Sequence, residues 1–191
     1  MDISLLRQVP LFEGLDDEQL EAIAPVTITR HFDKDQVIIL AEEEGDALFI
    51  ISQGQVKVSI VSEDGREVIL SLLGTGAVFG ELSLLDGKPR SANVVATQNT
   101  ELYMLRRSDF LQLVYKVPQI AVGLLSELAS RLRKTDRKIE GLALLDVTSR
   151  ISETLLQLAE EQGGATQKGV LLKSRPTHQQ IANMSGTTRE T

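Results

Sequence analysis

Short alternating segments separated by glycines recur through the first half of the chain, and this pattern restricts the fold more than any other feature. Between about Thr27 and Leu105, apolar and polar residues alternate in short runs, with glycines between them at positions 45, 54, 65 and 74. A spacing of about ten residues, with turn residues between the segments, is typical of an all-β barrel or roll. Residues 63–65, Glu-Asp-Gly, suit the tip of a hairpin. The sequence therefore predicts a β-roll in this region.

Helices are expected before and after the roll in the sequence. Asp16 is followed three residues later by Gln19, the spacing of a capping box, and this pair predicts a helix over residues 17–24. After the roll, Ser108 is expected to cap a short helix that ends before Pro118. Pro118 suits the first turn of the next helix, where no backbone N–H is needed.

That next helix, predicted over residues 118–145, carries an apolar seam. Its members alternate in spacing between three and four residues and are Leu125, Leu128, Leu132, Thr135, Ile139 and Leu142. This is the spacing of a coiled coil, so we expect two copies of the helix to pair and form a homodimer. The alternative is a helix packed on its own barrel. Thr135 is polar and costs stability in such a seam unless it sets the register or meets a ligand; from the residues alone it is a register residue.

The remaining segment predicts a small helical module. Asp146 is placed to cap a helix over residues 147–161. Residues 162–166, Gln-Gly-Gly-Ala-Thr, are interpreted as a linker, and residues 170–172 as a strand.

Two further helices are expected around Gly186. Thr177 and Gln180 have capping-box spacing and open the first of these helices, which ends at Gly186. Thr188 is expected to cap the second, whose first residues are Arg189, Glu190 and Thr191. This is helix-turn-helix geometry, in which the second helix enters the major groove. Arg189 is suited to guanine O6/N7 and Glu190 to cytosine N4, so the candidate DNA-binding residues are Thr177, Thr188, Arg189 and Glu190.

The run from Phe79 to Ser91 has the sequence FGELSLLDGKPRS and combines the groups that hold a phosphodiester and its ribose. The backbone amides of Gly80 and Glu81 suit phosphate oxygens at the start of a short helix. Arg90 offers a planar, charge-assisted fork to the same anion. The Glu81 carboxylate, unsuited to phosphate, suits a sugar hydroxyl. Singly these are ordinary turn and surface residues; together they favour a binding site.

Composition excludes several other classes of protein. No apolar stretch approaches the roughly 18 residues of a membrane span, and the N-terminus is not a signal peptide, so we expect a cytoplasmic bacterial-type protein. The absence of cysteine excludes disulfides and thiolate metal sites, and with only two histidines we expect no metal site. The net charge of −7 argues against a generally basic nucleic-acid binder. Residues 148–191, however, carry five basic and four acidic side chains, so the excess acid lies in the N-terminal part.

The pattern Phe-Gly-Glu-Leu…Pro-Arg-Ser-Ala resembles the phosphate-binding cassette of cyclic-nucleotide-binding domains. The whole chain resembles the catabolite activator (cyclic AMP receptor) branch of the CRP–FNR family of bacterial transcription factors, through residues 79–92, 142–150 and 180–191. The resemblance implies an α+β fold. Its parts would be a jelly-roll-like, cyclic-nucleotide-binding β-roll with flanking helices at 1–117, a dimerisation helix at 118–145 and a partial winged helix-turn-helix domain at 146–191.

The resemblance also implies a ligand, partners and a mechanism. Cyclic AMP would be the effector, with no cofactor, and the implied ligand-binding residues are Gly80, Glu81, Leu82, Arg90, Ser91, Thr135 and Asp136. The purine base would lie against Thr135, and a hinge near Asp146 would reorient the DNA-binding modules when the ligand binds. The implied partners are a cyclic nucleotide, double-stranded DNA, a second copy of the chain and RNA polymerase.

The sequence departs from the family pattern at two places. Asp136 stands where the receptor has serine, and its carboxylate can accept from adenine N6 or from guanine N1/N2. The sequence therefore does not decide whether the site prefers cyclic AMP or cyclic GMP. Alternatively, Asp136 pairs with Arg133 or Arg137 as a structural ion pair. The sequence also stops at Thr191, early in the expected recognition helix, so we expect a fragment that binds DNA poorly.

Three rival functions are weighed against this hypothesis. A regulator of the same fold can respond to another effector or to none. A phosphodiesterase would need a metal cluster or an activated nucleophile, and no such histidine or acid cluster is visible in the sequence. A nucleotide-binding module that controls a partner protein is disfavoured by residues 177–191.

Overall fold

Two antiparallel four-stranded sheets form the N-terminal part of the protein. The computed structural model describes residues 3–166, 169–172 and 175–190. One sheet has the order β1-β8-β3-β6 and the other β2-β7-β4-β5. Their strands are β1 Thr27–Phe32, β2 Val37–Ile39, β3 Ala47–Gln53, β4 Gln55–Val61, β5 Glu67–Gly74, β6 Val78–Phe79, β7 Asn93–Ala96 and β8 Thr100–Arg106. The predicted β-roll is therefore confirmed, and residues 63–65 lie in the turn between β4 and β5.

Short helices close one end of the roll. They are α1 Ile3–Leu6, the 3₁₀ turns η1 Pro10–Phe12 and η2 Ala24–Val26, α2 Asp17–Glu21 and α4 Arg107–Lys116. The predicted capping box is present, with Asp16 accepting from the Gln19 amide at 2.8 Å and Gln19 accepting from the Asp16 amide at 3.1 Å. The helix it opens is shorter than the predicted 17–24. Ser108 is not the cap of α4, because the helix already begins at Arg107.

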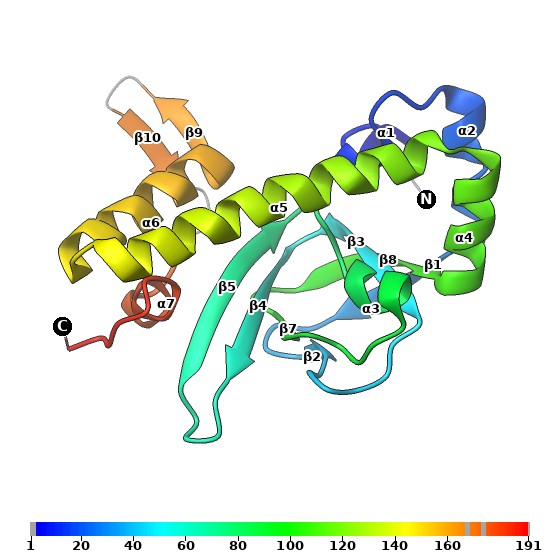
Figure 1. Cartoon of the computed structure of the whole chain (residues 1–191). Coiled ribbons are helices and arrows are strands. Elements are labelled where there is room, and N and C mark those ends of the chain that lie inside the picture. Colours follow the sequence, from blue (N-terminus) through cyan, green and yellow to red (C-terminus); the bar gives the residue numbers. More distant parts are fainter. Residues whose placement is uncertain (1–2, 167–168, 173–174, 191) are drawn as a thin grey trace.

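Helix α5, Gln119–Leu144, runs along the whole molecule and joins its two parts (Figure 1). Its N-terminal half packs on η1 and the roll through Ile120 and Leu124, which are buried. Most of the predicted seam faces outward: Leu125, Leu132, Ile139 and Leu142 are 65%, 62%, 59% and 57% exposed in the single chain. Leu128, also part of the predicted seam, instead packs partly buried against the core of the roll. The helix therefore buries one face on its own barrel and leaves the heptad face uncovered.

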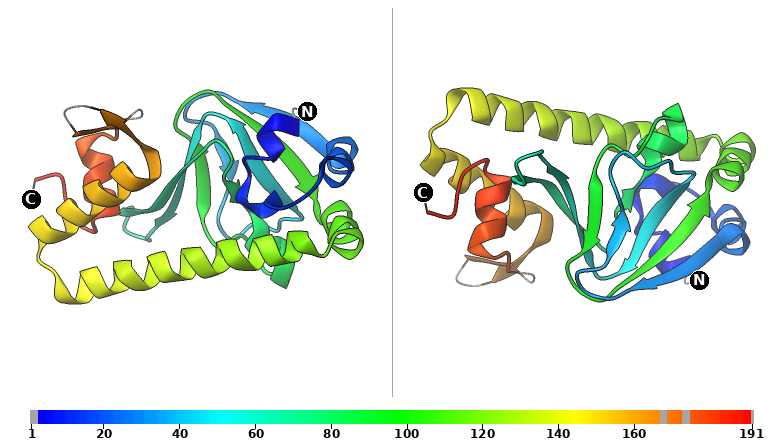
Figure 2. Two further views of the ribbon diagram at one scale, coloured as in Figure 1. Left: turned by 90° about the horizontal axis from the view of Figure 1, so that it is seen from above. Right: turned by 90° about the horizontal axis from the view of Figure 1, so that it is seen from below.

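The C-terminal module consists of α6 Val147–Gln162, the hairpin β9 Gly163–Thr166 and β10 Gly169–Leu172, and α7 His178–Met184. Both views in Figure 2 show these elements together at one end of α5. Asp146 caps α6 by accepting from the Ser149 amide at 2.8 Å, as predicted. Residues 163–166 are a strand rather than a linker, because they pair in register with β10.

Helix α7 begins at the predicted capping box of Thr177 and Gln180, but the second helix expected after Thr188 does not follow. Arg189 and Glu190 lie in a turn after Thr188, and Thr191 lies outside the described residues. The described residues thus contain the first of the two predicted helices and no helix at 188–190. In the part of the chain that the structure describes, no helix is both long and apolar enough to cross a membrane.

The module packs against the roll along strand β5. Ile69 and Leu72 of β5 form a buried cluster with Leu158 of α6, and Leu172 and Met184 pack on it. A polar contact accompanies the apolar one: Asn183 donates to Glu67 at 3.0 Å, and Glu67 also pairs with Lys57 at 2.6 Å.

Candidate ligand site

The segment that resembles a phosphate-binding cassette folds as a tight turn into a short helix. Strand β6 ends at Phe79, Gly80 adopts φ +80°, and α3 runs over Glu81–Asp86. A side chain at Gly80 would meet the Arg90 guanidinium at 2.8 Å and the Ala47 carbonyl oxygen at 3.1 Å. Glycine is therefore required here by its positive φ and by the close approach of Arg90.

Arg90 is buried beside this turn. It is 7% exposed and donates from Nη1 to the Gly80 carbonyl and from Nη2 to the Ala47 carbonyl, both at 2.8 Å. Burial lowers the pKa of the Arg90 guanidinium, while the charges of Asp46 and Glu81 act in the opposite direction. A guanidinium remains protonated in a protein, so this part of the site carries a fixed positive charge suited to an anion.

Glu81 is a buried carboxylate of which only one oxygen is hydrogen-bonded within the described chain. It is 3% exposed, and its Oε1 accepts from Arg131 Nη1 at 2.8 Å. Its Oε2 has no hydrogen-bond partner among the described residues. Since a buried polar atom is costly without a partner, Oε2 is poised to accept from a donor on a bound molecule.

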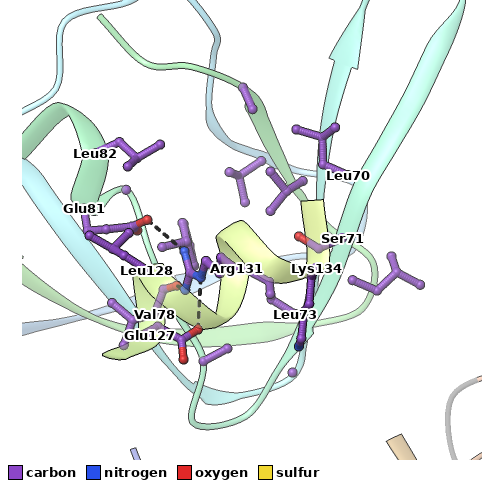
Figure 3. Close-up of a pocket in the computed structure, with 18 of the residues that line it drawn as sticks. Leu70, Ser71, Leu73, Val78, Glu81, Leu82, Glu127, Leu128, Arg131 and Lys134 are labelled. Carbon is purple, nitrogen blue, oxygen red and sulfur yellow. Dashed lines mark hydrogen bonds and ion pairs between the residues drawn. The ribbon is translucent and has the colours of Figure 1, made fainter. Parts of the chain in front are cut away.

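Arg131 connects the cassette to helix α5 and was not predicted from the sequence. Besides Glu81 it contacts Glu127 on the preceding turn at 2.9 Å (Figure 3). It also donates to the Val78 carbonyl oxygen. Its guanidinium therefore ties α3, β6 and α5 together. The four-residue spacing of Glu127 and Arg131 was the available signal, but it indicates only a helical ion pair and not the distant Glu81.

These groups line one cavity of about 760 Å³ between the roll and α5. Figure 3 shows side chains of β5, α3 and α5 converging on it. Of the predicted ligand residues, it is lined by Gly80, Glu81, Leu82, Arg90, Ser91 and Thr135. Thr135 is exposed and donates to the Arg131 carbonyl at 3.0 Å. Asp136 is exposed and is not part of this lining; within the described chain it makes no ion pair with Arg133 or Arg137.

The far end of the cavity reaches the C-terminal module. Gln157 and Glu161 of α6 line it together with Lys134 and Lys138 of α5. Lys138 donates to the Leu70 carbonyl of β5, and burial lowers the pKa of its ammonium group, partly offset by Glu161. The cavity therefore touches all three parts of the molecule: roll, long helix and module.

Known proteins resemble this chain over most of its length. Residues 29–116 match the family model "Cyclic nucleotide-binding domain". The Cyclic AMP receptor protein of Thermus thermophilus is 36% identical over 182 residues, which cover 95% of this chain and 81% of that protein. The CRP-like cAMP-activated global transcriptional regulator of Mycobacterium tuberculosis is 32% identical over 189 residues, covering 98% and 84%.

Solved structures also match this chain over most of its length. The Thermus thermophilus Catabolite Activator Protein matches at 35% identity with a TM-score of 0.66, covering 95% of this chain and 82% of that one. The c-di-GMP responsive global regulator CLP of Xanthomonas campestris matches at 26% identity with a TM-score of 0.80, covering 92% and 87%.

Proposed function

This chain belongs to the CRP–FNR family of transcriptional regulators, and we propose that it is a homodimeric, cyclic AMP-responsive DNA-binding regulator of the bacterial cytoplasm. As a family member it is a regulator and not an enzyme. The observation that carries the proposal is the cavity with a buried arginine and, beside it, a buried carboxylate whose Oε2 lacks a donor among the described residues.

The chemistry of a cyclic nucleotide fits these groups. Arg90 and the amides of Gly80 and Glu81 take the phosphate, while Ser91 adds a hydroxyl beside it. The ribose 2′-hydroxyl supplies the donor that Glu81 Oε2 lacks. The purine lies toward Thr135 of α5, on the same side of the cavity as Arg131.

A second copy completes the assembly in this proposal. The exposed seam of α5 includes Leu132, which also lines the cavity, so pairing of two α5 helices would cover apolar surface and close the ligand site in one step. The ligand then favours one arrangement of the two modules because it contacts the helices that join them. Double-stranded DNA is the proposed target of the modules, through Thr177, Thr188, Arg189 and Glu190, and RNA polymerase is a further proposed partner.

The alternative is a regulator of the same fold with another effector, or with none. Cyclic GMP remains a candidate effector, although Asp136 does not line the cavity of the single chain. The similarity to the c-di-GMP responsive regulator of Xanthomonas campestris adds cyclic di-GMP to the effectors to be tested.

Calorimetric titration with cyclic AMP, cyclic GMP and cyclic di-GMP tests the proposal. We expect micromolar binding of cyclic AMP and weaker binding of the other two. Arg90→Leu should lose on the order of 2–5 kcal/mol of binding free energy, about thirtyfold or more in Kd. Arg30→Leu, an exposed arginine outside the cavity, is the matched control. Glu81→Gln keeps the size of the side chain and is expected to weaken binding through the ribose. Unchanged affinity in both site variants would remove the basis of the proposal.

A further inference from the structure

Two side chains of the C-terminal module belong to the wall of the ligand cavity. Gln157 and Glu161 lie one helical turn apart on α6, and both line the cavity. They are joined to each other, because Gln157 Nε2 donates to Glu161 Oε1 at 3.0 Å. The same oxygen pairs with Lys134 Nζ of α5 at 2.8 Å. The three side chains form a polar cluster where the module meets the long helix.

This cluster lies next to the place expected for the purine. Lys134 precedes Thr135 directly in the chain, and both line the cavity. Three residues after Thr135, Lys138 binds the Leu70 carbonyl and closes the gap toward β5. A base that reaches Thr135 from the cassette therefore extends toward the end of the cavity formed by Gln157 and Glu161.

Building on the proposed function, we infer that Gln157 and Glu161 form the base-recognition end of the effector cavity. The polar edge of the purine is then read in part by the DNA-binding module itself. A carboxamide offers one acceptor and a donor group, the combination that matches adenine with its amino donor and ring-nitrogen acceptor. A carboxylate only accepts, and it matches the two neighbouring N–H donors of guanine. Gln157 accordingly favours adenine, and Glu161 is the residue through which guanine binds.

This arrangement gives the effector a direct contact with the part of the molecule that it controls. A ligand shifts a conformational equilibrium only through differential interactions with the two states. A base bound to α6 has such an interaction, since the contact exists only when the module lies against the cavity. By reciprocity, the position of the module also changes the affinity for the base.

The test measures base selectivity rather than affinity alone. The ratio of the Kd values for cyclic GMP and cyclic AMP is determined by calorimetry for the wild type, Gln157→Ala and Glu161→Gln. The matched control is Glu160→Gln, since Glu160 is the neighbouring exposed acid and does not line the cavity. We expect Gln157→Ala to reduce the preference for cyclic AMP about fivefold or more and Glu161→Gln to weaken cyclic GMP selectively. The control should leave the ratio unchanged.

A second ligand separates base recognition from a general effect on the fold. The cyclic monophosphate of unsubstituted purine riboside lacks the exocyclic amine but keeps the ribose and the phosphate. The wild type should bind it more weakly than cyclic AMP, and Gln157→Ala should bind the two about equally. Ratios unchanged in both α6 variants, in a protein that binds cyclic AMP, overturn this inference and leave the proposed function intact. A wild type that binds no cyclic nucleotide rejects the proposed function and this inference with it.

Discussion

Removal of Arg131 is the sharpest test of how the ligand site is held together. In Arg131→Met, Glu81 keeps its charge at a position where its side chain is 4% exposed and loses the donor to Oε1. Breaking a buried ion pair from one side costs about 3–5 kcal/mol, because it leaves an uncompensated charge. Arg131 is itself 29% exposed, and the Arg90 charge also acts on Glu81, so we expect the lower end, about 3 kcal/mol. For a chain of this length, that corresponds to a fall in Tm of about 6–12 °C.

The control variant is Glu127→Gln, because Glu127 pairs with the same guanidinium of Arg131. Glu127 pairs with Arg131 at 2.9 Å but is 30% exposed, and a pair with helical i,i+4 spacing contributes less than about 1 kcal/mol. Glu127→Gln should therefore change stability little. The double variant Arg131→Met/Glu81→Gln removes the unpaired charge and should recover most of the loss.

Urea unfolding followed by circular dichroism is the suitable assay, since the chain has no tryptophan. If Arg131→Met is destabilised no more than Glu127→Gln, or if the double variant recovers nothing, then Glu81 is not held as a buried anion. The unpartnered oxygen of Glu81 could then no longer be taken as the acceptor that a ligand satisfies.

Three further predictions concern the scaffold. Gly123→Ala should destabilise the protein by about 1–3 kcal/mol although alanine favours a helix, because the alanine methyl group would collide with the Leu11 carbonyl oxygen. A variant that is more stable than the wild type in urea unfolding would contradict this prediction. Burial opposes ionisation of Glu67, but its bonds to Lys57 and other neighbours lower its pKa below the ordinary 4.5. Its contribution to the free energy of unfolding is therefore present above that pH and is lost as the pH falls through the folded pKa. In urea titrations from about pH 7 to about pH 3, the free energy of unfolding of Glu67→Gln should fall less steeply than that of the wild type, and equal slopes would refute the prediction. Thr177→Ala should lower the free energy of unfolding by about 1 kcal/mol because it removes the side-chain cap of α7, whereas Thr177→Ser keeps the cap and should not. Equilibrium unfolding of the two variants measures this difference.

Local patterns in the sequence predicted most of the scaffold. The two capping boxes, at Asp16/Gln19 and Thr177/Gln180, are present, because each depends only on residues three apart. The Ser108 prediction was wrong because α4 begins at Arg107, at the end of strand β8, without a side-chain cap. The linker at 162–166 was wrong because its glycines, typical of a loop, are paired with β10 in a hairpin.

The candidate site was predictable where its residues are close in sequence. Gly80, Glu81 and Arg90 belong to one short run of the chain, so their grouping could be predicted, and they line one cavity. Arg131 was missed because its partner lies fifty residues away in the chain, and only the packing of α5 on the roll brings the two together. For the same reason, no sequence pattern indicated Gln157.

The position of β5 has a consequence for the handling of this protein outside its folded state. The strand forms the edge of its sheet and includes the run Val68-Ile-Leu-Ser-Leu-Leu73, which is apolar and rich in strand-forming residues. Such an edge is a template for pairing with another chain, and here the C-terminal module and Lys138 cover it. A roll produced without residues 147–190 would lose the apolar cover of Ile69 and Leu72, so we expect it to associate through β5 more readily than the whole chain.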